Sequence, residues 1–99
     1  MTRLADMAPK IRSKNAGPFW LTIDIFCETA EVFTRISDGL QTAEMARAFA
    51  TQTGQIKRFD IAALNVIKIS LPRPAVQGTR EDRDMHGASF AEIVGELRI

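Results

Sequence analysis

The chain has little cysteine and no excess charge of either sign, and each absence excludes a class of protein. A single cysteine, Cys27, cannot build a disulfide scaffold, and one unpaired thiol is typical of a reducing cytoplasm. Thirteen Lys and Arg against twelve Asp and Glu leave a net charge of +1, which excludes an ordinary basic nucleic-acid binder and an acidic disordered tail. We therefore expect no nucleic acid and no membrane among its partners.

Long apolar segments are also missing. The first fifteen residues contain Arg3, Asp6, Lys10, Arg12 and Lys14 and no apolar core, so they do not resemble a targeting signal. No unbroken apolar stretch approaches the length of a membrane span. These absences predict a cytoplasmic protein.

The residues that are present have the balance of a small globular domain. With 99 residues, 45% apolar and 25% charged, the chain is predicted to form a single domain over residues 1–99 with a modest core. A domain of this size often depends on a partner for additional burial. One histidine and one cysteine are too few for a zinc site, so no metal and no organic cofactor is implied.

The clearest secondary-structure pattern lies at residues 19–27, where the side chains alternate with a period of two. This predicts a strand with one apolar face and one mixed face. Cys27 belongs to the apolar face, so we expect it to be a buried small hydrophobe rather than a reactive thiol. On the mixed face we expect Asp24 either to meet solvent or to pair with Lys68 across the sheet. Trp20 and Phe26 share that face, and we expect it, or the outer surface of the helices, to form a protein interface.

Two segments after this strand have apolar residues at helical spacing. The first covers about residues 30–38, with Thr29 as its N-terminal cap. The second covers about residues 43–53, with Thr42 as its cap and Gly54 at its end. The residues expected on their buried faces are Phe33, Ile36, Leu40, Ala46, Phe49 and Ala50.

Further strands and a last helix follow. A short strand is predicted at residues 56–59, a turn or single helical turn at 60–64 and a central strand at 65–71. The last helix begins at Ser89 or, in a longer version, at Thr79. Together these elements predict an α+β fold: a small mixed or antiparallel sheet of about three or four strands with two to three helices packed on one face.

The most distinctive polar region is the Arg-rich segment, residues 72–87, directly after the predicted central strand. Loops held by a rigid strand often carry function, Arg recognises carboxylate or phosphate in a bidentate manner, and His shuttles protons near neutral pH. The residues proposed to bind an anion are Arg73, Gln77, Arg80 and Arg83. The residues proposed for acid–base catalysis are His86 and Asp84. The alternative is a self-paired network of Arg and Asp that orders the loop and caps a helix.

A second candidate is the turn at residues 12–17, which can present hydrogen-bond donors to an anion. The side chains proposed to contribute are Ser13, Lys14 and Asn15. The alternative is an ordinary basic turn, because the glycine-to-lysine spacing of a phosphate loop is absent. If the two strongest strands are antiparallel neighbours, this turn lies at the same end of the sheet as the Arg-rich segment. We then expect Arg73, Arg80, Arg83 and His86 to converge on it.

Three strings of sequence, residues 11–19, 65–74 and 77–88, are similar to those of a known family. With them, essentially the whole chain resembles domain of unknown function 4387, an uncharacterised family associated with proteins like the acyclic terpene utilisation protein AtuA. The resemblance implies a small subunit that acts with a larger AtuA-like protein in the catabolism of branched or terpenoid carboxylic acids or their thioesters. It implies no catalytic residues.

Three functions therefore compete. The first is a small partner subunit that contributes an anion-binding, Arg-rich loop to a site shared with the larger protein. The second is a stand-alone lyase, hydratase or isomerase that acts on a carboxylate or an acyl thioester. It would use His86 as the acid–base group, Arg73 and Arg80 to hold the substrate, and a homo-oligomer to build a deeper cleft. The third is a purely structural oligomerisation domain.

Overall fold

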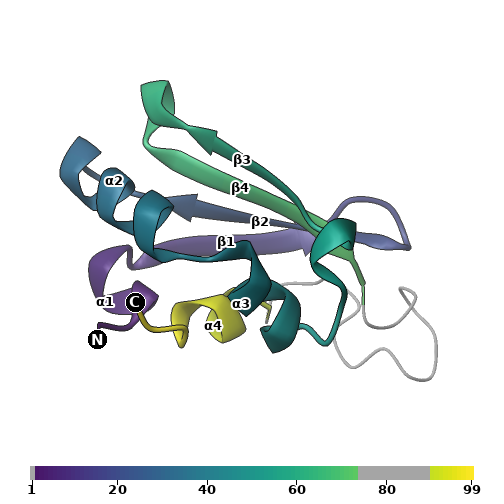
Figure 1. The fold of residues 1–99 in the computed structure, drawn as a ribbon. Helices are drawn as coiled ribbons and strands as arrows, with labels where there is room; N and C mark the ends of the chain where they lie inside the picture. The colour runs from purple at the N-terminus through teal and green to yellow at the C-terminus, as the bar shows by residue number, and fades with distance from the viewer. Residues whose placement is uncertain (1, 74–89) are drawn as a thin grey trace.

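The computed structural model describes residues 2–73 and 90–99 (Figure 1). Its helices and strands in chain order are α1 (Leu4–Met7), β1 (Lys10–Asn15), β2 (Trp20–Phe26), α2 (Ala30–Gly39), α3 (Thr42–Ala48), β3 (Lys57–Ile61), β4 (Val66–Pro72) and α4 (Phe90–Gly95). Short 3-10 turns, η1 (Thr53–Gln55) and η2 (Ala62–Leu64), flank β3. The predicted α+β class is confirmed.

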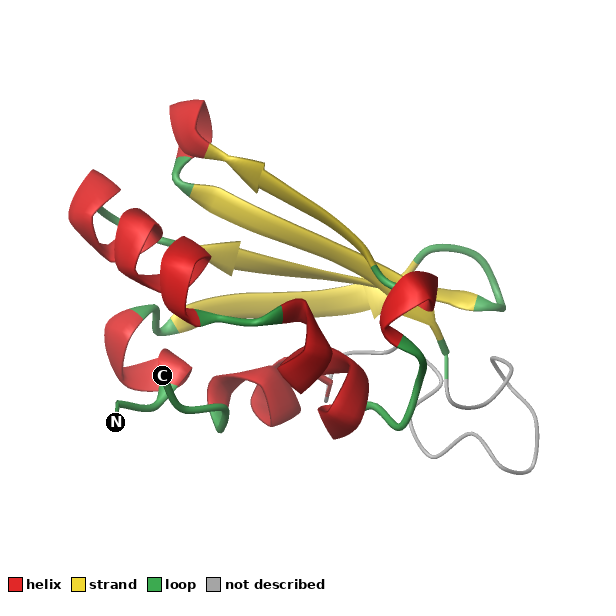
Figure 2. Ribbon diagram, viewed as in Figure 1, coloured by secondary structure: helices red, strands yellow, loops and turns green. Residues whose placement is uncertain are grey.

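The four strands form one antiparallel sheet in the order β1-β2-β4-β3. The two strongest predicted strands, β2 and β4, are its central pair, with Trp20 opposite Pro72 and Phe26 opposite Val66. The helices lie together on one side of this sheet, as Figure 2 shows. Because β2 and β4 are antiparallel, the start of β2 and the end of β4 meet at the same end of the sheet.

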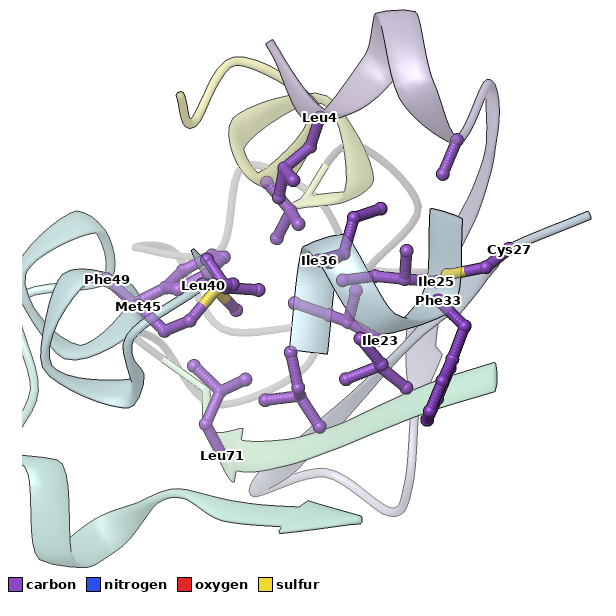
Figure 3. Packing of buried hydrophobic residues seen from close by; sticks show 14 of the residues in the cluster. Leu4, Ile23, Ile25, Cys27, Phe33, Ile36, Leu40, Met45, Phe49 and Leu71 are labelled. Atoms are coloured by element: carbon purple, nitrogen blue, oxygen red, sulfur yellow. The ribbon is translucent and has the colours of Figure 1, made fainter. Parts of the chain in front are cut away.

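The core lies between the sheet and the helices (Figure 3). Alternate residues of β2 and β4 point toward the helices and are completely buried: Leu21, Ile23, Ile25, Ile67, Ile69 and Leu71. The helices cover them with the buried side chains of Leu4, Phe33, Ile36, Leu40, Met45, Phe49 and Val94. Cys27 is buried as predicted, and burial, together with the charge of Asp60, raises the pKa of its thiol.

Helix α2 begins and packs as its sequence predicts. The side chain of Thr29 accepts a hydrogen bond from the backbone N–H of Val32 at 3.2 Å, which satisfies one of the free donors of the first turn. Phe33, Ile36 and Leu40 are all buried. The spacing of these apolar side chains therefore predicted the packed face correctly.

Helix α3 is shorter than predicted, because it ends at Ala48 rather than near Gly54. Ala50 has a φ of 52°, and the N–H groups of Ala50 and Thr51 bond back to the carbonyls of Arg47 and Ala46. This arrangement is a Schellman motif with alanine in the left-handed position that glycine usually occupies. The prediction that Ala50 is buried is therefore wrong, and the buried residues of this segment are Met45, Ala46 and Phe49. Thr42 is the first helical residue rather than the cap.

We expect Ala50→Gly to stabilise the protein, because glycine adopts the left-handed conformation without the steric penalty of a Cβ atom. The gain is about 0.5–1 kcal/mol after the greater backbone entropy of glycine in the unfolded chain is included. Urea unfolding monitored by circular dichroism measures it. Ala48→Gly, inside the same helix, is the control and is expected to destabilise by a similar amount. An Ala50→Gly protein that is less stable than the wild type would contradict this assignment.

Strand β1 corrects the prediction of a basic turn at residues 12–17. Lys10 to Asn15 pair with Phe26 to Leu21 of β2, so only residues from Ala16 onward form the turn. The alternation is hard to recognise because the inward positions hold Ile11, Ser13 and Asn15, of which only one is apolar. The predicted strand at 56–59 is also shifted, to Lys57–Ile61, and the single helical turn after it is η2. Helix α4 starts at Phe90 among the described residues, and both predicted start points, Ser89 and Thr79, lie outside them.

Arg58 and Asp60 join β3 to the end of α2. Arg58 donates hydrogen bonds from Nε and Nη2 to the Asp60 carboxylate, at 2.8 and 3.1 Å, from Nη2 to the carbonyl of Ser37 at 2.9 Å, and from Nη1 to the carbonyl of Leu40. The Ser37 hydroxyl also donates to Asp60. The guanidinium therefore satisfies carbonyls that the C-terminus of α2 leaves free.

The same cluster makes stability depend on pH. Partial burial of Asp60 opposes its ionisation, but hydrogen bonds from Arg58 and Ser37 and the charge of Arg58 outweigh this, so its pKa falls below the usual 3.8. A carboxyl whose pKa is lower in the folded state contributes stability above its unfolded pKa and loses it as the pH falls through the folded value. We expect acid unfolding below about pH 4 to be shallower in Asp60→Asn than in the wild type. Urea unfolding at pH 7 and pH 3 measures the effect, and a loss of unfolding free energy between these pH values that is equal in the two proteins would contradict it.

Residues near the two ends of the described chain pair with each other. The backbone of Thr2 exchanges hydrogen bonds with that of Ile99, at 2.9 and 3.1 Å, and the N–H of Leu4 donates to the carbonyl of Leu97 at 2.8 Å. Arg3 adds an ion pair with Glu96 at 2.7 Å. This terminal clasp places α1 against α4, on the inward side of β1 (Figure 1).

Candidate functional site

Arg73 lies at the end of the sheet where β4 stops and β2 starts. Its backbone N–H donates to the carbonyl of Phe19 at 2.9 Å, which extends the pairing of the two strands by one residue. Its side chain is buried, with 8% of the residue exposed. The guanidinium donates to Oδ1 of Asn15 and lies 5.7 Å from the centre of the Phe90 ring. Cation–π and hydrogen-bonding contacts therefore hold Arg73 in a fixed position.

Ser13 belongs to the same region and makes a structural contact. It is buried on the inward side of β1, and its hydroxyl oxygen accepts a hydrogen bond from the backbone N–H of Ala91 at 2.8 Å. This bond satisfies a donor in the first turn of α4. Ser13, Asn15, Arg73 and Phe90 therefore form one group, which we call the Arg73 cluster.

Lys14 does not join the Arg73 cluster. It lies opposite Thr22 on β2, is exposed and points away from the helices. The physical reason is that residues 12–17 form a strand in their first part, and successive side chains of a strand point to opposite faces. The expected convergence is therefore correct for Arg73 with Asn15 and wrong for Lys14, whereas Ser13 bonds to Ala91.

The remaining predicted site residues lie outside the described residues, so their proposed roles stay predictions. They are Gln77, Arg80, Arg83, Asp84 and His86. The structure describes the residues on either side of this part of the chain, Arg73 before it and Phe90 after it. Arg73 and Phe90 are in contact, so both belong to the Arg73 cluster.

A second candidate surface was predicted only in part, as the mixed face of the strand that is now β2. The open face comprises the side chains that point away from the helices, at the even-numbered positions of β1, β2 and β4 and at residues 57, 59 and 61 of β3. None of them is fully buried, and no described element covers them. Its basic side chains are Lys10, Arg12, Lys14, Lys57 and Lys68, and its aromatic side chains are Trp20, Phe26 and Phe59. Recognition of β1 as a strand would have placed three of these cations on one edge.

Cations lie over aromatic rings on the open face. Lys10 Nζ is 5.0 Å from the centre of the Phe26 ring, and Lys57 Nζ is 5.6 Å from the centre of the Trp20 ring. Asp24 is the one acidic side chain there. Its Oδ1 lies 3.9 Å from Lys68 Nζ and receives no hydrogen bond from the described residues. The predicted pairing of Asp24 with Lys68 across the sheet is confirmed.

Three other features of the described residues bear on function. An open cavity of about 350 Å³ lies between α1, β1 and α4, with Glu92 and Glu96 in its lining and mostly small or apolar residues elsewhere. Within residues 2–73 and 90–99, His, Cys, Asp and Glu side chains form no group of three that could hold a metal ion. No helix in that part of the chain has both the length and the apolar character to cross a membrane.

Comparison with models of protein families identifies the family of the chain. The family model described as Domain of unknown function (DUF4387) matches residues 4–95. The chain belongs to this family. A search of curated proteins and a search of solved structures found no significant match. The matched range in the DUF4387 chain includes all four strands, the Arg73 cluster and the open face.

Proposed function

We propose that this DUF4387 chain is a small partner subunit that acts with a larger AtuA-like protein in the catabolism of branched or terpenoid carboxylic acids or their thioesters. The observation that supports this most is the open face. Two faces of a sheet need cover, and here the described helices cover one. The other face keeps Trp20 and Phe26 half-buried and Phe59 55% exposed, which favours contact with a second protein.

The Arg73 cluster supports the second part of the proposal, a contribution to an anion-binding site. Arg is the side chain best suited to planar, bidentate recognition of carboxylate or phosphate. Asn15 and Phe90 fix the guanidinium of Arg73 at the start of the Arg-rich segment. We propose that this segment supplies Arg73, Arg80 and Arg83 to a site shared with the larger subunit.

Co-expression with an AtuA-like protein tests the partner role. The tag is placed at the C-terminus, because both ends of the described chain lie beside α1, at the end of the sheet opposite the one where β4 stops (Figure 1). We expect the large protein to co-purify in a fixed ratio and to migrate with this chain in size-exclusion chromatography. A chain that stays separate from the co-expressed protein would contradict the partner role. Turnover of carboxylates or thioesters by this chain alone would favour the stand-alone enzyme.

We expect Arg80→Ala to weaken anion binding by the complex by roughly tenfold or more, because a hydrogen-bonded charge contributes about 1.5–3 kcal/mol. Isothermal titration with isovalerate and with its coenzyme A thioester measures the effect. Arg35→Ala is the matched control, since Arg35 is exposed on α2 and donates to Thr2 at 3.2 Å. Arg80→Ala protein that unfolds outright would instead support the structural network of Arg and Asp.

A further inference from the structure

The open face has a strong imbalance of charge that the whole chain does not share. It carries five basic side chains and one acidic one, whereas the chain has a net charge of only +1. We propose that the open face docks against an acidic surface of a partner protein. This inference rests on the proposed partner role but specifies the surface and the chemistry of the contact.

The register of the strands shows where the cations lie. Lys10, Arg12 and Lys14 follow one another along the outward side of β1, at one edge of the sheet. Lys57 lies on β3 at the opposite edge, and Lys68 lies between them on β4. With about 4.8 Å between strands and about 6.8 Å between alternate residues, the cations on β1 and β3 border an area of roughly 14 by 14 Å that contains Lys68. A protein surface with carboxylates opposite these cations and apolar side chains opposite the aromatic rings would complement it.

Aromatic side chains at the ends and at one edge of the open face supply apolar contact. Trp20 begins β2, Phe26 ends it, and Phe59 lies on the edge strand β3. Trp20 and Phe26 are half-buried and Phe59 is 55% exposed, so aromatic surface remains for a partner. Aromatic side chains are enriched among the residues that dominate binding energy at protein interfaces.

A nucleic acid fits the open face less well than a protein, although basic and aromatic residues on a sheet also bind single strands. Stacked bases need free ring faces, and here the ammonium groups of Lys10 and Lys57 lie over the rings of Phe26 and Trp20. The carboxylate of Asp24 in the middle of the face repels phosphate.

A second copy of this chain fits less well still. In a symmetric contact the same patch meets itself, so five cations would face five cations. Like charges brought together at an interface oppose association by several kcal/mol. The observed charges therefore favour a different, acidic protein.

Charge reversal with a matched control tests the surface. Lys14→Glu/Lys57→Glu changes two exposed side chains at opposite edges of the open face, and neither lies opposite an acid. Arg35→Glu/Arg47→Glu changes the charge by the same amount on α2 and α3. In biolayer interferometry against the co-purified large protein, we expect the first variant to raise Kd at least tenfold and the second less than twofold. We expect the wild-type Kd to rise with salt. Equal effects of the two variants, with both folded by circular dichroism, would overturn the docking surface and leave the partner role intact.

A photo-cross-linking amino acid in place of Phe59, expressed in the native host, tests the surface without assuming the identity of the partner. The control carries it in place of Ile93, which is 41% exposed on α4. We expect position 59 alone to cross-link to an acidic segment of one protein, and the purified protein to bind less tightly to Lys14→Glu/Lys57→Glu. If that protein is not AtuA-like, the proposed function fails and the docking surface stands. Cross-links only to this chain, no cross-link, or specific retention of a single-stranded 20-mer or of anionic vesicles would overturn the inference.

Discussion

Replacement of Phe49 by alanine is expected to lower the free energy of unfolding by about 3–5 kcal/mol, the usual range for a buried phenylalanine. Phe49 lies at the C-terminal end of α3 and is 6% exposed. Its ring centre is 6.0 Å from that of Phe90, with a tilt of 50° between the rings, so the change removes a tilted aromatic pair as well as apolar burial. For a domain of this length, the expected fall in Tm is about 12 °C or more.

Phe49→Ala is also expected to loosen the Arg73 cluster. The Phe90 ring contacts both the Phe49 ring and the guanidinium of Arg73. Without the Phe49 ring, the Phe90 ring can move, and it then holds the Arg73 guanidinium less firmly. Hydrogen exchange of the Arg73 backbone N–H, which is bonded to Phe19, should become faster in native buffer. Phe59→Ala is the matched control, because Phe59 is exposed, and should change stability by less than about 1 kcal/mol. Equal losses in the two variants would contradict the packing described for Phe49.

Arg58→Ala is expected to cost about 2–4 kcal/mol, because it removes several charge-assisted hydrogen bonds at once. The side chain of Arg58 is 15% exposed, so water replaces few of these bonds. The change leaves the carbonyls of Ser37 and Leu40 without their donor and Asp60 without its countercharge. Urea unfolding at pH 7 measures the loss.

Two controls separate this contribution from surface charge. Arg47→Ala removes an ion pair with Glu44 in which the arginine side chain is 76% exposed, and it should change stability by less than about 0.5 kcal/mol. Arg58→Lys keeps the charge but not the planar fork of donors, so it should be intermediate. An Arg58→Lys protein as stable as the wild type would show that charge alone, rather than the hydrogen bonds to α2, holds β3 in place.

Much of the fold could be predicted because burial leaves a periodic pattern in the sequence. The alternation in β2 and the three- and four-residue spacing in α2 each place apolar side chains on one face, and both segments pack as that spacing requires. The prediction of a turn at residues 12–17 was wrong, because hydrogen bonds replace apolar burial on the inward side of β1. In β1 the inward Ser13 and Asn15 bond to Ala91 and Arg73 instead of entering the core, so the strand has no apolar stripe.

The end of α3 and the basic residues of the open face on β1 and β3 could not be predicted for related reasons. Glycine is the usual signal for a left-handed residue after a helix, and here Ala50 takes that conformation, so Gly54 indicated the wrong end. The open face depends on which strands are neighbours, and its basic residues come from β1, β3 and β4. Their combination becomes visible only once the register is known, because residues from strands far apart in the sequence contribute to it.

The clasp between residues 2–4 and 97–99 has a consequence for synthesis on the ribosome. Strands β1 to β4 can pair once residue 72 has left the exit tunnel, but the backbone bonds of Thr2 and Leu4 to Ile99 and Leu97 form only after residues 97–99 follow. Contacts between residues so distant in sequence form late. Until then, Leu4 and the inward side of β1 remain in contact with water, and apolar surface exposed in this way promotes aggregation. A nascent chain stalled before residue 97 is therefore a suitable client for chaperones that bind apolar segments.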